Sequence, residues 1–173
     1  MNDIQPVETN SKYWKKGDVF LSMPHLALVV LYRPNENKVI WYKQGPWLHQ
    51  HDVDIINETT IGIYNNNDFS LLENETGFNN VLYYNFETQK ITNPYKRLFE
   101  NNKIKSKTES LFSILDNGDI FVEENNHARI LRGDKEGNLK WHLLWDARIN
   151  WARFLSEKKY KNLINEMNQN VCK

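Results

Sequence analysis

Cysteine is almost absent from this sequence: the only one, Cys172, lies one residue before the C-terminal lysine. A single cysteine cannot form an internal disulfide, so the sequence excludes a small disulfide-stapled fold. We expect Cys172 to be an exposed thiol of the tail and not a catalytic nucleophile.

Net charge is absent as well, because 22 basic residues balance 22 acidic ones. Nucleic acids and anionic membrane surfaces are recruited by a strong positive field, which this chain lacks. We therefore expect neither a nucleic acid nor a membrane among its partners.

Long apolar runs are missing too. Residues 1–16 are polar and contain no apolar signal core, and no run approaches the roughly 18 apolar residues of a membrane span. The chain as written therefore carries no signal peptide and no transmembrane segment, and its location stays open.

The residues that are present are typical of a folded globular protein. Hydrophobic residues make up 40%, aromatic residues 13% and charged residues 25%, which excludes the disordered and fibrous classes. A length of 173 residues suits one domain with a sizeable core. We therefore expect a single domain over residues 1–173.

A unit of short strands occurs three times along the chain. Each unit has a turn, a β-branched run, a second apolar run, a polar turn and a third strand. Short strands of this composition, separated by Asn, Gly and Asp, are typical of antiparallel meanders. The strands of the three units are 17–22, 27–32 and 38–42; 60–64, 80–84 and 90–92; and 117–122, 128–131 and 138–142.

An apolar stretch before a unit supplies a fourth strand, as at 53–56 and 111–115. Four-stranded sheets at intervals of roughly 40–50 residues are typical of propeller blades, and paired apolar residues indicate sheets buried on both faces. The predicted fold is all-β: a partial β-propeller of about three four-stranded antiparallel blades over residues 17–150, followed by a C-terminal α-helix. An immunoglobulin-like sandwich fits the strand count but does not predict the repeat.

Three polar segments interrupt the pattern. Residues 1–16 form an N-terminal segment, residues 68–79 an inserted loop within the second blade, and residues 101–107 a basic crossing between blades.

The C-terminal segment, residues 151–173, has a different period. Its apolar residues fall at spacings of three and four, which predicts an amphipathic helix over about 152–167. We expect this helix to pack on the last blade through Phe154, Leu155, Leu163 and Ile164.

From Asn2 to about Trp151 the chain resembles the C-terminal part of the propeller of the arylsulfotransferase family. The most specific match is Gln50-His51-Asp52, followed by a strand and an Asn-containing turn. The other matching segments are Asn2-Asp3-Ile4-Gln5-Pro6-Val7, Trp14 to Ser22, Lys38 to Trp41, Gly45, Tyr64-Asn65-Asn66 and Leu115 to Asp119. The resemblance implies part of a propeller of about six blades, in a family whose members are often exported.

The resemblance also implies a reaction: transfer of a sulfuryl group from an aryl sulfate to a phenol through a covalent sulfohistidine, without a nucleotide donor or another cofactor. A neutral imidazole is the nucleophile in such chemistry, and polar donors neutralise the sulfate oxygens. His51 is the candidate nucleophile, because an ordinary histidine pKa of about 6.5 leaves it mostly neutral near pH 7.

Further candidates surround His51. We expect Asn66 and Arg129 to stabilise the sulfate oxygens, unless Glu123 or Glu124 neutralises Arg129 across the strands. The residues expected to contact substrate are Trp47, Gln50 and Asp52, of which Asp52 could also orient the imidazole.

Metal ions are a weaker hypothesis. His49 and His51 form a His-x-His pair that shares one face of a strand, but no third ligand follows at a suitable spacing. Residues 65–68 resemble half of a calcium loop without its glycine and terminal glutamate. We therefore predict no metal site.

Two functions stay open: a sulfotransferase-like enzyme, and a non-catalytic propeller segment that binds a ligand or serves in assembly. Blades in an open arc also leave apolar faces uncovered at both ends, and a second copy of the chain is the commonest way to bury such faces. We therefore expect a homodimer.

Overall fold

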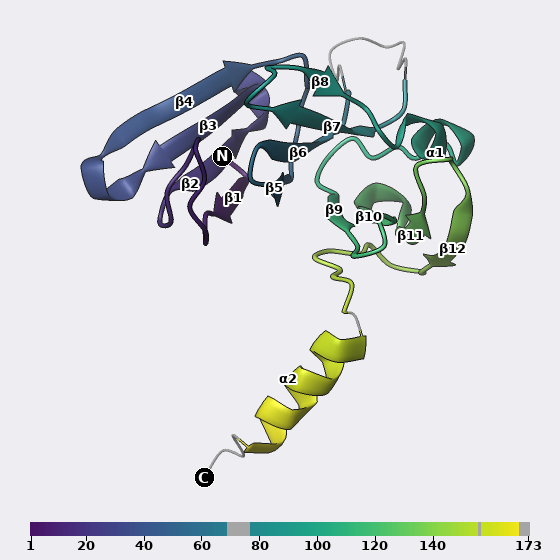
Figure 1. Ribbon diagram of the computed structural model, residues 1–173. Helices are drawn as coiled ribbons and strands as arrows, with labels where there is room; N and C mark the ends of the chain where they lie inside the picture. Colours follow the sequence, from purple (N-terminus) through teal and green to yellow (C-terminus); the bar gives the residue numbers. More distant parts are fainter. Residues whose placement is uncertain (69–76, 156, 170–173) are drawn as a thin grey trace.

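The structure is a computed structural model that describes residues 1–68, 77–155 and 157–169. Three four-stranded antiparallel sheets follow one another in an arc (Figure 1), which confirms the predicted series of blades. Blade 1 contains β1 (Asp3–Pro6), β2 (Val19–Met23), β3 (Leu28–Arg33) and β4 (Lys38–Gln44); blade 2 contains β5 (Val53–Asn57), β6 (Thr60–Asn65), β7 (Asn80–Asn85) and β8 (Ile91–Thr92); blade 3 contains β9 (Leu111–Ile114), β10 (Ile120–Glu124), β11 (Arg129–Gly133) and β12 (Leu139–Leu144).

The hydrophobic core lies between the blades, not within one sheet. One cluster joins blades 1 and 2 around Trp14, Phe20 and Ile63. A second cluster joins blades 2 and 3 around Tyr64, Phe112 and Leu131. Every residue of β6 is consequently buried, and this stacking distinguishes the arc from a two-sheet sandwich.

A carboxylate holds each blade to the chain that follows it. The Val53 amide donates to Asp3 Oδ2 over 3.0 Å, and the Phe112 amide donates to Asp52 Oδ2 over 2.9 Å. The Ala152 amide donates to Glu123 Oε2, which lies on β10, the second strand of blade 3. These three hydrogen bonds, which we call the joint caps, place Asp3, Asp52 and Glu123 at the inner edge of the arc.

Two elements were not predicted. β1 lies within the expected N-terminal segment and pairs with β2, so blade 1 has its fourth strand. Helix α1 (Lys96–Asn101) precedes the basic crossing and buries Leu98 and Phe99 completely. Both elements are too short for a strand or helix period to be visible in the sequence.

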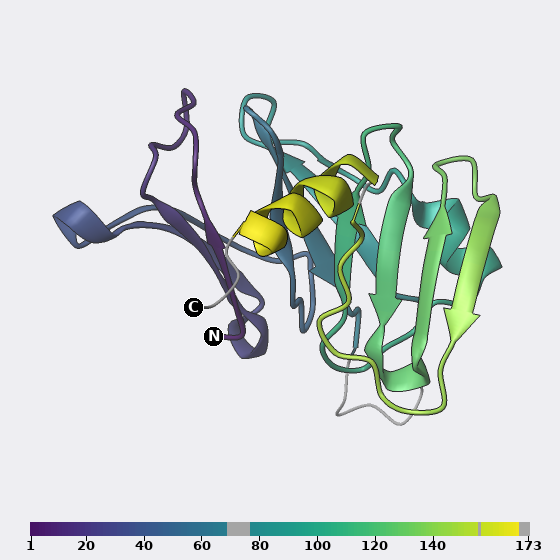
Figure 2. The same ribbon diagram turned by 90° about the horizontal axis from the view of Figure 1, so that it is seen from below.

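The C-terminal helix exists, but its expected packing on blade 3 is wrong. Helix α2 spans Glu157–Gln169 and projects from the inner side of the arc (Figures 1 and 2). Leu155 and Leu163 remain 49% and 42% exposed. Of the four expected contacts, Phe154 lies beside Phe121 of blade 3, with ring centroids 6.0 Å apart. The joint cap on Ala152 explains the difference, because it holds the preceding chain at the inner edge and starts the helix away from the sheet.

Across the described residues, neither helix combines the length and the apolar character that a bilayer crossing requires.

Candidate functional site

His51 lies at the inner end of blade 2, just before β5. Its amide donates to Tyr64 O over 3.0 Å, and the Tyr64 amide donates to Asp52 O over 2.8 Å. The pairing with β6 therefore extends to residues 51 and 52, just before β5 begins, and fixes their backbone. The expected position of His51 beside an inner strand agrees with this geometry.

The His51 ring contacts Asn66 directly. His51 Nδ1 lies 2.9 Å from Asn66 Oδ1 and 3.0 Å from the carbonyl oxygen of His49. Burial lowers the pKa of the half-buried His51 ring from its ordinary value, although these hydrogen bonds partly oppose the shift. The shift favours the neutral form of the ring near pH 7.

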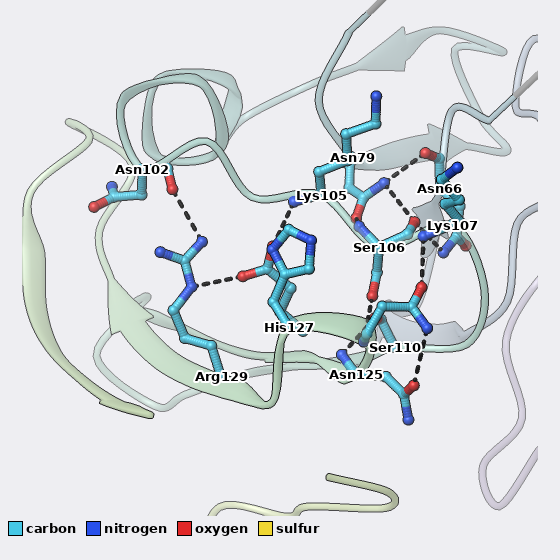
Figure 3. A network of polar contacts seen from close by, with 12 residues as sticks. Asn66, Asn79, Asn102, Lys105, Ser106, Lys107, Ser110, Asn125, His127 and Arg129 are labelled. Atoms are coloured by element: carbon cyan, nitrogen blue, oxygen red, sulfur yellow. Dashed lines mark hydrogen bonds and ion pairs between the residues drawn. The ribbon is translucent and has the colours of Figure 1, made fainter. Parts of the chain in front are cut away.

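Asn66 is itself held by the crossing between blades 2 and 3, which in the structure runs over residues 102–110 between α1 and β9. Its Nδ2 donates to Ser106 O over 3.0 Å and to Glu109 O over 2.9 Å. Asn79 lies beside it and also donates to Ser106 O, as Figure 3 shows. Only 1% of Asn66 is exposed, so its amide belongs to the wall of the site.

His51 and Asp52 line a cavity of about 290 Å³ at the inner edge of blades 2 and 3. The other residues that line it include Asp3, Glu109, Glu123 and Trp151. A neighbouring cavity of about 490 Å³ shares Asp3, Asp52 and Trp151 and adds Asp54, Phe112 and Arg153. In the described part of the chain, no lysine or arginine lines the first cavity, and Arg153 is the cation of the second.

Burial shifts the carboxyl groups along these cavities towards their neutral forms. It raises the pKa of Asp52 well above its ordinary value, and the charge of Asp54 adds to this. The pKa of Asp54 is raised to about 6, again chiefly by burial. Burial also raises the pKa values of Asp3 and Glu123, although Arg153 acts in the opposite direction on all four groups.

Gln50 and Trp47 lie next to His51 in sequence but not in the cavity. Gln50 is fully buried, and its Nε2 donates to Leu28 O over 3.0 Å. Trp47 is fully buried in the core between blades 1 and 2. The sequence placed both beside the histidine because it shows proximity along the chain but not the direction of a side chain.

Arg129 is also remote from the cavity. Its Nε donates to the fully buried Glu124 over 2.6 Å, and its Nη2 donates to Asn102 O over 2.9 Å. Arg129 and Asn66 lie at opposite ends of the polar network in Figure 3. Of the two interpretations that the sequence allowed, the geometry supports neutralisation of Arg129 by a glutamate across the strands.

The other histidines lie apart from the cavity. His25 and His49 form a ring pair with centroids 5.8 Å apart on the turns of blades 1 and 2. His127 and His142 belong to the exposed surface of blade 3. Within residues 1–68, 77–155 and 157–169 no three His, Cys, Asp or Glu side chains gather as metal ligands, and Cys172 lies outside these ranges.

Sequence reasoning did not single out Asp3, Trp151 and Arg153 as site residues. Asp3 stands in the segment Asn2 to Val7, and the resemblance of that segment to the family was the available signal. Trp151 and Arg153 follow β12 and gave no such signal, because their position depends on the last joint cap.

A family model described as arylsulfotransferase (ASST) matches residues 1–147 of the chain. The chain belongs to the arylsulfotransferase family. The matched residues include all three blades together with His51, Asn66 and Asp52, whereas Trp151, Arg153 and α2 lie beyond the matched range. No curated protein matches the chain.

Proposed function

We propose that this chain carries the nucleophilic part of an arylsulfotransferase site, with His51 as the nucleophile. The observation that supports the proposal is an imidazole ring that contacts Asn66 and lines a cavity, in a chain of this family. Aryl sulfates are the proposed donors and phenols the proposed acceptors.

In the first step an imidazole nitrogen of His51 attacks the sulfur of the aryl sulfate. The N–S bond forms, the S–O bond to the aryl group breaks, and the bonding pair leaves on the phenolate oxygen. A protonated Asp52 in the same cavity can give its proton to that oxygen, because its pKa is raised well above the ordinary value. In the second step Asp52 takes the proton of an acceptor phenol, whose oxygen attacks the sulfur and frees His51.

The remaining site residues have unequal support. Trp151 lines the His51 cavity and is 69% exposed, so its ring face is accessible to an aryl group. The substrate contacts of Trp47 and Gln50 and the oxyanion role of Arg129 stay predictions. The geometry gives them no support, since none of the three residues lines the His51 cavity.

A binding or assembly module is the second candidate function. It is favoured by one observation: the described residues that line the His51 cavity include several carboxyl groups and no lysine or arginine. Sulfuryl transfer would then require cations from elsewhere.

The test is turnover of a nitrophenyl sulfate with a phenol as acceptor. We expect nitrophenol release from the parent protein, and His51→Asn should lower the rate by on the order of 1,000-fold or more. The intact mass should increase by one sulfuryl group when donor is added without acceptor. His142→Asn is the matched control, because His142 is exposed on β12, and it should keep the parent rate.

The pH profile gives a second measurement. Burial lowers the pKa of His51, so its neutral form persists below pH 6.5. The acidic limb of the kcat/KM profile should therefore lie below the ordinary histidine value. Release that persists in His51→Asn contradicts the nucleophile assignment, and no release from the parent favours the binding module.

A further inference from the structure

We propose that Asn66 is a positioning residue that holds His51 in the Nδ1–H tautomer and so leaves Nε2 as the nucleophilic nitrogen. The inference deepens the proposed function and rests on it. It gives Asn66 a different role from the oxyanion donor expected from the sequence.

The first step concerns the direction of the Asn66 amide. Its nitrogen lies 3.0 Å from Ser106 O and 2.9 Å from Glu109 O, and both of these atoms are acceptors. A flipped amide would point its oxygen at two carbonyl oxygens, so the nitrogen must occupy this position. Both amide hydrogens are then used, and Oδ1 is the atom that faces His51.

The second step concerns the proton on His51. Nδ1 lies within 3.0 Å of two oxygens, Asn66 Oδ1 and His49 O, and neither can donate a hydrogen. Nδ1 must therefore carry the hydrogen, which the two acceptors share in a three-centre bond. A neutral ring has only one N–H, so the lone pair lies on Nε2.

The third step concerns access. His51 lines the cavity of about 290 Å³, whereas Asn66 is buried behind it. In the described part of the chain no hydrogen bond engages Nε2, while Nδ1 faces the wall. The nitrogen that can attack a sulfur atom in the cavity is Nε2, and the sulfohistidine should carry its sulfuryl group there.

The wall behind Asn66 is rigid enough for this role. Asn79 accepts a hydrogen bond from the Tyr64 hydroxyl over 3.0 Å and donates to Ser106 O over 3.1 Å. The crossing of residues 102–110 has no regular structure, so these side chains hold its carbonyl groups in place (Figure 3). Asn66 thus transmits the position of the crossing to the imidazole ring.

The tautomer can be observed without substrate. Long-range ¹H–¹⁵N correlation spectra of the full chain, labelled on histidine, distinguish a protonated from a bare ring nitrogen. We expect His51 to show a protonated Nδ1 and a bare Nε2 at pH 7. A parent spectrum with Nε2 protonated and Nδ1 bare would overturn the inference.

Two variants separate positioning from simple structural support. Asn66→Ala removes one of the two acceptors, so a share of the Nε2–H tautomer should appear in the spectrum. Asn66→Asp replaces the donating nitrogen with an oxygen that can face the carbonyl oxygens of Ser106 and Glu109 when it carries a proton, and its other oxygen still accepts from Nδ1, so this variant should keep the parent tautomer. Asn126→Ala is the matched control, because Asn126 accepts hydrogen bonds from the Lys107 and Thr108 amides of the same crossing. Its printed hydrogen bonds reach neither Asn66 nor the His51 ring, so this variant should leave tautomer and pKa unchanged.

The outcomes also separate this inference from the proposed function. If Asn66→Ala leaves the tautomer of His51 as in the parent, Asn66 is structural and the inference is wrong. If the spectra show the expected tautomers but neither the parent protein nor any variant turns over aryl sulfate, the proposed enzymatic function is wrong and the inference about the tautomer stands. In an active protein Asn66→Ala should lower kcat by roughly 100-fold and change KM little, because Asn66 does not touch the substrate.

Discussion

Residues with the same charge have different roles in this chain, and Arg129 and Arg153 illustrate this. Arg129 is paired with Glu124, which is fully buried. Arg153 lies in a cavity and lowers the pKa values of several carboxyl groups. The surroundings of each arginine decide which one is available to a ligand. Amino-acid composition does not give this information.

Removing the Arg129 side chain should destabilise the fold. Arg129→Met removes the guanidinium from the buried Glu124, which keeps the Lys105 amide and the His127 ring as contacts, so the loss of unfolding free energy should lie near or below about 3 kcal/mol, the lower end for a broken buried ion pair. Adding Glu124→Gln removes the buried charge and keeps an acceptor for the Lys105 amide, so the double variant should recover much of the loss. Urea unfolding of both variants measures this.

A different result would restore the oxyanion role of Arg129. If Arg129→Met unfolds like the parent but loses turnover of aryl sulfate, the arginine acts on the ligand and not on the fold.

The His51–Asn66 pair was partly predictable from the sequence. The resemblance selected both residues, and the hairpin of β5 and β6 explains why side chains 15 positions apart meet. The direction of the Asn66 amide was not predictable, because it depends on the carbonyl oxygens of Ser106 and Glu109, about 40 residues further along the chain.

At the scale of elements, the strands were predictable and the helices less so. Strands follow from local alternation and from turns such as the one between β10 and β11, whereas α1 has only six residues. The position of α2 depends on a contact between Glu123 and the Ala152 amide, which no helical period encodes.

The two helices should therefore differ in their contribution to stability. Leu98 of α1 is completely buried, so Leu98→Ala should cost about 3 kcal/mol of unfolding free energy. Leu163 of α2 is 42% exposed, so Leu163→Ala should change stability by less than about 0.5 kcal/mol. The midpoints of urea unfolding compare the two variants directly when both unfold with the same m value, the slope of unfolding free energy against urea concentration.

Equal losses would contradict this difference. A large loss for Leu163→Ala would mean that α2 packs on a partner in solution, and a small loss for Leu98→Ala would mean that the core between blades 2 and 3 tolerates the cavity.

At the scale of the whole molecule, both ends of the arc present a sheet face that no further blade covers, although Phe154 lies against Phe121 and Arg132 on blade 3. The outer face of blade 1 carries a row of apolar residues across its four strands: Ile4, Leu21, Val30 and Tyr42. The outer face of blade 3 carries Trp141 and Leu143, which are 38% and 45% exposed. Faces of this kind are covered in the middle of the arc by the next blade.

We expect these faces to produce a homodimer at micromolar concentration. Light scattering after size exclusion should give twice the chain mass of 20.7 kDa. Tyr42→Lys and Leu143→Lys place a charge on the two faces and should return the monomer. Tyr160→Lys on α2 is the control and should keep the dimer.

A mass of 20.7 kDa that persists on concentration would contradict the dimer. A dimer that dissociates only in Tyr160→Lys would show that α2, and not the sheet faces, forms the contact.

The three joint caps also show where the chain stands in the blade repeat when blade 3 ends. Trp145 donates to Ala128 O as Gly45 donates to Ala27 O, and the Ala152 amide then bonds a carboxylate as Val53 and Phe112 do, although Glu123 belongs to the second strand of its blade. Residues 151–155 thus lie at the inner edge beside blade 3, where a following blade would begin, without forming a strand. A four-stranded blade that arrives at blade 3 with its own inner strand would compete with them for the same place. Closing a ring with a second copy therefore requires this segment to leave, whereas a three-stranded sheet could complete the repeat with the segment in place.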